Sequence, residues 1–76
     1  MRYNQKGGIM PDLQKLKSEI LQSGITMTAL ARKSNIERAT LYNRLRGVGE
    51  FTASEIMGIS TALHLTNDQR DDIFLS

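Results

Sequence analysis

Cysteine and tryptophan are absent from this chain of 76 residues, and proline and histidine occur once each. Without cysteine, neither a disulfide framework nor a thiolate metal site is available, which suits a reducing compartment. No apolar run approaches the roughly 18 residues that a membrane span requires, and no signal-peptide pattern opens the chain. We therefore expect a soluble intracellular protein without a membrane partner.

Charge is modest in total, with a formal net charge of +2, but it is unevenly distributed. Residues 26–49 carry five Lys and Arg residues against one Glu, whereas residues 50–76 carry one Arg against five acidic residues. A basic middle followed by an acidic end indicates one face for an anionic partner. Two ordinary solvated faces would give the same counts, so charge alone leaves both interpretations open.

The length of the chain allows one small domain with a thin margin of stability. Residues 1–9 show no periodicity and contain a Gly pair, so we interpret them as a flexible N-terminal arm preceding a domain over residues 10–76. Met10 is an alternative start. The sequence leaves open whether the arm is native or partly of artificial origin.

Apolar residues at helical spacing predict an all-α domain, because no strand pattern competes with them. The expected helices cover about residues 11–23, 26–34, 37–45, 52–64 and 66–74. Pro11 suits a first helical position and Asp12 a first turn. Thr26 is an N-cap candidate. Two capping boxes are expected, Thr52 with Glu55 and Thr66 with Gln69.

The same spacing predicts which side chains turn inward. Most are aliphatic and recur three or four positions apart, so that each helix presents one apolar stripe to a common core. The expected inward residues are Leu13, Leu16, Ile20, Leu21, Met27, Leu30, Ala31, Ile36, Leu41, Leu45, Ile56, Ile59, Leu63, Ile73 and Phe74.

Two of the expected helices are short and lie almost end to end. Each is too short to be stable alone in water, so the other helices must hold them. Asn35 lies between them, and Asn tolerates the left-handed backbone conformation that a sharp turn requires. Two helices joined by about three residues are typical of a helix-turn-helix, whose second helix enters the DNA major groove.

The stretch "TMTALARKSNIERATLYNRLRG", residues 26–47, resembles the helix-turn-helix of the phage Cro and repressor family, also called XRE-type or lambda-repressor-like. The resemblance rests on Thr26, the Leu30-Ala31 pair, Ile36, the Thr40-Leu41 pair and Gly47, and it extends over about residues 10–75. It implies a compact five-helix fold. It also implies sequence-specific binding of double-stranded DNA by a small phage-type or prophage-type regulator of transcription in the bacterial cytoplasm.

The resemblance also implies which side chains of the recognition helix, at about residues 37–45, meet DNA bases. Arg38, Ala39 and Asn43 occupy the positions that usually meet base edges, with Glu37 and Tyr42 nearby. The residue types suit this role, because Arg bonds guanine bidentately and Asn bonds adenine. Ala permits close approach to a thymine methyl, and Glu can accept from a cytosine amine.

Phosphate contacts are expected from basic and hydroxyl side chains, which position the protein without reading sequence. The expected set is Thr26, Arg32, Lys33, Thr40, Arg44 and Arg46. Such domains usually bind palindromic half-sites as dimers. We expect a weak or DNA-induced homodimer here, formed through the acidic C-terminal helix and an exposed Phe74 or Leu75.

A second interpretation is a module that keeps the helix-turn-helix fold but binds a partner protein. Three departures from the family's usual residues favour it: Met27 where Gln is common, Ser34 where the turn usually has an aliphatic residue, and Glu37 where Ser or Thr often caps the helix. An enzyme is not expected, because the sequence offers no nucleophile–base pair, metal ligand set or phosphate loop. No cofactor is expected, and we interpret His64 as a surface or capping residue.

Overall fold

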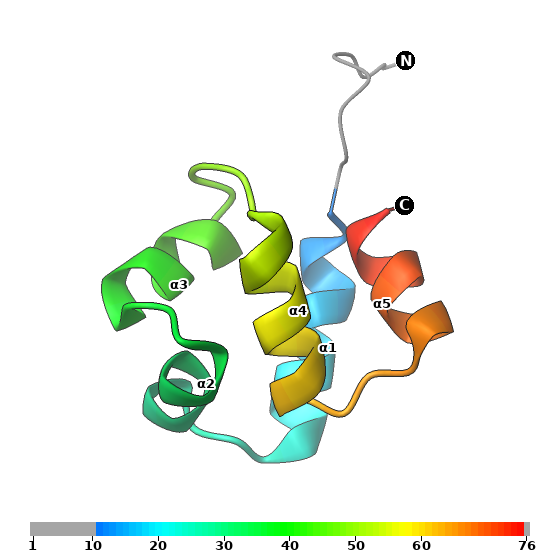
Figure 1. Cartoon of the computed structure of the whole chain (residues 1–76), viewed down its shortest axis with the longest axis horizontal. Coiled ribbons are helices and arrows are strands. Elements are labelled where there is room, and N and C mark those ends of the chain that lie inside the picture. Colours follow the sequence, from blue (N-terminus) through cyan, green and yellow to red (C-terminus); the bar gives the residue numbers. More distant parts are fainter. Residues whose placement is uncertain (1–10, 76) are drawn as a thin grey trace.

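The computed structural model describes residues 11–75, which form five α-helices and no strand (Figure 1). The all-α prediction is therefore confirmed for this part of the chain. The predicted arm at residues 1–9 lies outside the described residues, as does Met10. The helices are α1 (Leu13–Ser23), α2 (Met27–Ser34), α3 (Arg38–Leu45), α4 (Ala53–Ala62) and α5 (Asn67–Phe74).

The helix starts follow the expected capping chemistry in three of five cases. The hydroxyl of Thr26 accepts a hydrogen bond from the backbone N–H of Ala29 at 3.0 Å. Thr52 and Thr66 each form a complete capping box. These caps satisfy backbone donors that the first turn of a helix would otherwise leave unpaired, which explains why such short helices begin at these residues.

Two predicted helix starts are shifted. The first helix begins at Leu13, and Asp12 is its N-cap rather than a residue of its first turn, with its carboxylate accepting from the N–H of Lys15 at 3.1 Å. Pro11 therefore precedes the cap. Glu37 is the N-cap of α3, with extended backbone angles (φ −64°, ψ 142°) and no side-chain cap bond. Both errors arise because a cap residue and a first-turn residue are favoured by similar side chains.

The core is built almost entirely from the predicted aliphatic residues. Leu21 is the clear exception, since it is 82% exposed. It follows Ile20 by one residue, which rotates it about 100° from the buried stripe of α1. The buried apolar residues are Leu16, Ile20, Leu30, Ala31, Ile36, Leu41, Leu45, Ile59, Leu63, Ile73 and Phe74.

The helix-turn-helix is held mainly by α4, which packs against α2 (Figure 1). Gly58 makes this close packing possible. A Cβ atom at Gly58 would lie 2.6 Å from the backbone oxygen of Ser34. Ser34 itself is buried, and its hydroxyl has no hydrogen-bond partner within residues 11–75. Close backbone contact between α2 and α4 thus fixes the pair of short helices on the rest of the domain.

Helices α1 and α5 close the other side of the domain. The N–H of Asp12 donates to the carbonyl of Ile73 at 2.6 Å. The ammonium of Lys15 lies 2.6 Å from the carboxylate of Asp72, and this hydrogen bond raises the pKa of Lys15. Both groups are at least half exposed, so the ion pair locates α5 rather than contributing much stability.

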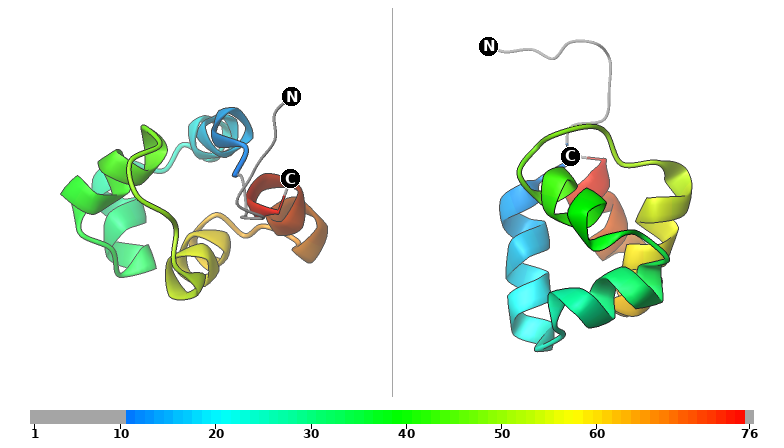
Figure 2. Two further views of the ribbon diagram at one scale, coloured as in Figure 1. Left: turned by 90° about the horizontal axis from the view of Figure 1, so that it is seen from above. Right: turned by 90° about the vertical axis from the view of Figure 1, so that its left-hand side faces the viewer.

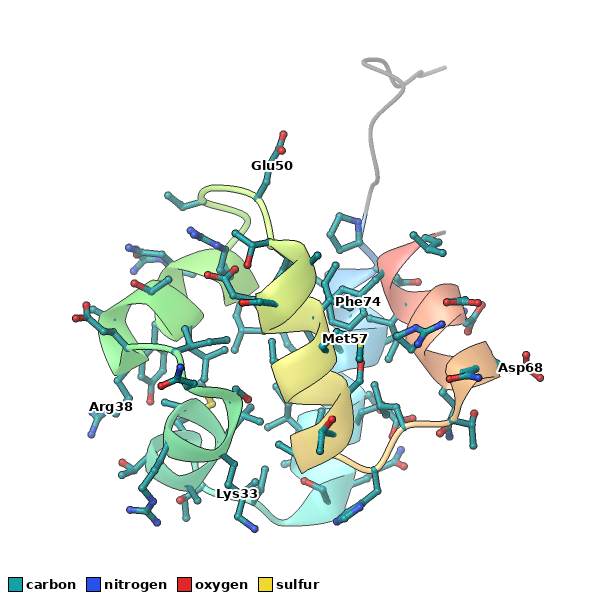
Figure 3. The ribbon with its side chains drawn as sticks, in the orientation of Figure 1. Lys33, Arg38, Glu50, Met57, Asp68 and Phe74 are labelled. Atoms are coloured by element: carbon teal, nitrogen blue, oxygen red, sulfur yellow. The ribbon has the colours of Figure 1, made fainter. Side chains whose placement is uncertain are left out.

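Phe74 was predicted both as an inward residue of the last helix and as an exposed dimer contact. Its side chain is 1% exposed, and its ring meets that of Phe51 edge to face with centroids 5.2 Å apart. The inward prediction is therefore confirmed and the exposed one is wrong, because α5 places Phe74 between helices (Figure 3). Leu75 remains 56% exposed. Within residues 11–75, no helix is both long and apolar enough to span a membrane.

Candidate nucleic-acid interface

The turn between α2 and α3 is fixed by its backbone. Asn35 adopts the left-handed conformation (φ 59°, ψ 43°), as its residue type predicts. The next residue, Ile36, is buried and donates its N–H to the carbonyl of Ala31 at 2.9 Å. This combination reverses the chain in few residues and sets α3 across the end of α2, on the face seen in the right-hand view of Figure 2.

Helix α3 has one buried face and one exposed face. Leu41 and Leu45 are buried, which anchors the helix to the core as predicted. Arg38, Ala39 and Tyr42 are exposed. The five residues expected to meet bases are therefore all on the solvent side or at its margin, with Asn43 half-buried and Glu37 exposed at the N-cap.

Arg38, the first residue of α3, is held by two neighbours. Its Nη1 donates to the hydroxyl oxygen of Thr28 in α2 at 3.1 Å. Its guanidinium carbon lies 5.9 Å from the centre of the Tyr42 ring, at the outer limit of a cation–π contact. Thr28 was not among the predicted contact residues. It lies ten residues before Arg38 in the chain, and the two side chains meet only because the turn brings the starts of α2 and α3 together.

Asn43 and Arg46 are paired at the other end of α3. A guanidinium nitrogen of Arg46 donates to the side-chain oxygen of Asn43. An Asn that bonds adenine bidentately needs both its oxygen and its amide nitrogen. The Asn43 oxygen has a second lone pair, so it can accept from an adenine amine while it keeps the Arg46 hydrogen bond. That bond holds the Asn43 side chain in one orientation at the end of α3.

Arg44 forms contacts that hold the fold together. Its Nε lies 3.2 Å from a carboxylate oxygen of Glu55, and both side chains are mostly buried. The same Glu55 oxygen accepts the N–H of Thr52 in the capping box of α4. The Arg44 Nη1 also donates to the carbonyl of Val48. One carboxylate thus ties the recognition helix to the start of α4, a role that differs from the predicted phosphate contact.

The other predicted phosphate-binding residues lie in or beside α2 and α3. Arg32 and Lys33 are exposed in the last turn of α2, where positive charge also suits the helix dipole. Figure 3 shows Lys33 extending from the lower edge of the domain, apart from Arg38 at its outer edge. Thr26 is exposed but its hydroxyl caps α2, and Thr40 is half-buried.

Apart from Glu37 and Glu55, the acidic side chains of the described C-terminal half lie outside α2 and α3. Asp68 in α5 is at the opposite side of the domain from Arg38 (Figure 3). The uneven charge of the sequence therefore becomes a spatial separation, with a basic α2–α3 side and an acidic α5 side. Among residues 11–75, no group of three or more His, Cys, Asp and Glu side chains is arranged to hold a metal ion.

A comparison of the chain with models of protein families agrees with this geometry. The model of the Cro/C1-type HTH DNA-binding domain matches residues 15–69, more than half of the chain. The chain belongs to this family. Members of the Cro/C1-type family are DNA-binding domains and typically not enzymes, so membership supports DNA binding by a regulator. No curated protein and no solved structure matches the chain.

Proposed function

We propose that this Cro/C1-type domain is a sequence-specific, double-stranded DNA-binding regulator of the phage or prophage type, most simply a repressor. Helix α3 lies in the major groove, and its exposed side reads the bases. The observation that carries this proposal is the first turn of α3, where Arg38 is exposed, beside the small side chain of Ala39. A guanidinium and an adjacent small residue suit a guanine edge and close approach to the groove floor.

The remaining contacts follow from position. Asn43 reads a second base, and Glu37 and Tyr42 border the contacted base pairs. Phosphates are bound by Arg32 and Arg46, with Lys33, Thr26 and Thr40 at the margins. Arg44 contributes mainly by holding α3 against α4, since its guanidinium is occupied by Glu55.

The domain acts on palindromic half-sites as a weak or DNA-induced homodimer. Burial of Phe74 removes it from the set of available dimer contacts. Leu75 at the end of α5 is left as an exposed apolar residue for such a contact.

Selection of bound sequences from a random duplex pool tests the proposal directly. The expected result is an enriched palindrome whose half-sites are about one helical turn apart. Binding to it should weaken steeply with salt, because phosphate contacts release counterions. No enrichment at low salt would refute specific binding. A stable complex with a protein partner would then favour the alternative module, which the exposed carboxylate of Glu37 beside Arg38 supports.

Two charge-matched variants locate the interface. Arg38→Ala should abolish preference at one base pair of each half-site and cost about 1–3 kcal/mol of binding free energy. Lys17→Ala removes the same charge from an exposed position of α1, outside α3 and outside the proposed dimer contact, and should leave affinity and preference unchanged. Equal losses from both variants would indicate a nonspecific electrostatic effect instead of base contact by α3.

A further inference from the structure

We propose that Thr28 is a positioning residue that holds Arg38 in its base-reading conformation, so that a residue of α2 sets the sequence preference of α3. The inference rests on the proposed function. Thr28 is exposed and its side chain has one hydrogen bond among the described residues, which is the 3.1 Å contact with Arg38. The cap of α2 is supplied by Thr26, so the Thr28 hydroxyl is not needed to start the helix.

The contact joins a stiff side chain to a flexible one. A β-branched Thr in a helix has few side-chain conformations, so its hydroxyl is held in place by the backbone. A long Arg side chain loses much conformational entropy when it is ordered on DNA. Ordering Arg38 before binding therefore lowers the cost of the base contact, which is the general benefit of preorganisation.

The geometry leaves the reading edge of the guanidinium available. Thr28 takes the Nη1 group, and the guanidinium carbon lies over the Tyr42 ring. No hydrogen bond of Nε or Nη2 forms within residues 11–75. A bidentate contact with the O6 and N7 atoms of guanine needs two adjacent donors, and the Nε–Nη2 edge provides them. Thr28 and Tyr42 thus restrict Arg38 without consuming the edge that recognises the base.

The alternative role for Thr28 is direct contact with a phosphate, since it lies in the first turn of an exposed helix. The two roles predict different patterns. A phosphate contact weakens binding to all sequences alike and acts independently of Arg38. A positioning residue changes preference at the base pair that Arg38 reads and has no effect once Arg38 is gone.

The test is a double-mutant cycle read out on the selected operator and on duplexes that vary the Arg38 base pair. Thr28→Val removes the hydroxyl while keeping shape, and it should reduce affinity for the operator about two- to tenfold while flattening preference at that base pair alone. Thr28→Ser restores a hydroxyl and should restore preference. In an Arg38→Ala background, Thr28→Val should change nothing.

The outcomes separate this inference from the proposed function. If wild-type protein enriches no sequence, the proposed function fails and this inference fails with it. If wild-type protein selects an operator but Thr28→Val leaves preference intact, or weakens every duplex equally with or without Arg38, only the positioning role is overturned. Circular dichroism of each variant is the control for folding. Helix content and melting temperature should be unchanged, so that differences in binding between the variants reflect DNA recognition and not loss of folded protein.

Discussion

Replacing Gly58 by Ala should destabilise this domain, although the same change normally stabilises a helix. Ala is favoured over Gly in a helix interior by about 0.8–1.0 kcal/mol. Gly58 lies within α4 and is not among the glycines with positive φ, so its backbone would accept Ala. Propensity alone therefore predicts a rise in the free energy of unfolding, and the packing of α2 against α4 must reverse it.

The expected loss of stability follows from how close a Cβ atom at Gly58 would come to the backbone of Ser34. A Cβ at Gly58 would meet the backbone oxygen of Ser34 at 2.6 Å, with the Cα and carbonyl carbon of Ser34 at 3.1 and 3.2 Å. These atoms belong to the backbone of α2, so no side chain can rotate away. The helices must separate until the oxygen reaches ordinary contact, and overpacking of this kind costs about 1–3 kcal/mol. The gain in helix propensity offsets about 0.8–1.0 kcal/mol of this cost, so we expect a net loss of about 1 kcal/mol for a cost in the middle of that range.

Thermal unfolding followed by circular dichroism measures this effect. A loss of about 1 kcal/mol lowers the melting temperature of a domain of this size by about 4–8 °C. Thr61→Ala is the matched control, because Thr61 is exposed in the same helix and the change also improves helix propensity. A Gly58→Ala protein that melts at or above the wild-type temperature would show that α2 and α4 can separate freely, contrary to the packing argument.

Three further changes test other contacts, each measured as the free energy of unfolding in urea. Ser34→Ala should stabilise the domain by about 1 kcal/mol because it removes a buried hydroxyl without a partner in the described chain. A loss of stability would indicate that the hydroxyl has a hydrogen-bond partner. Glu55→Ala should lower the free energy of unfolding by about 1–2 kcal/mol, because it removes a capping-box acceptor and an ion pair. Glu55→Gln should lower it less, because the amide oxygen can still accept the hydrogen bond of the capping box. Asn35→Ala should cost about 1 kcal/mol, because Ala is strained in the left-handed backbone conformation of this residue, whereas Asn35→Gly should be tolerated. Equal effects of the two changes would show that backbone strain is not the cause.

The local features of the fold were predictable because they depend on near neighbours in the chain. Capping by Thr52 and Thr66, the turn at Asn35 and the shared helix face of Leu41 and Leu45 all follow from residue type and spacing. Each involves groups within a few residues of one another, for which intrinsic conformational preference is decisive. The family resemblance was likewise carried by local sequence, and the family comparison confirms it.

Two errors about burial concern contacts between distant segments. Leu21 has the apolar character of a core residue, but it is 82% exposed on α1. Phe74 was also expected as an exposed dimer contact, yet α5 places its ring edge to face against Phe51. In both cases burial depends on which element lies opposite, which residue type does not encode.

The sequence by itself determined that this chain is an all-α domain of the Cro/C1-type family, with a short helix pair presenting an Arg-bearing and Asn-bearing surface. Only the tertiary structure decided how each polar side chain is used. It assigned Arg44 to Glu55, paired Asn43 with Arg46 and brought Thr28 to Arg38. Helical periodicity specifies the direction of a side chain within its own helix, whereas its partner is fixed by the packing of another helix against it.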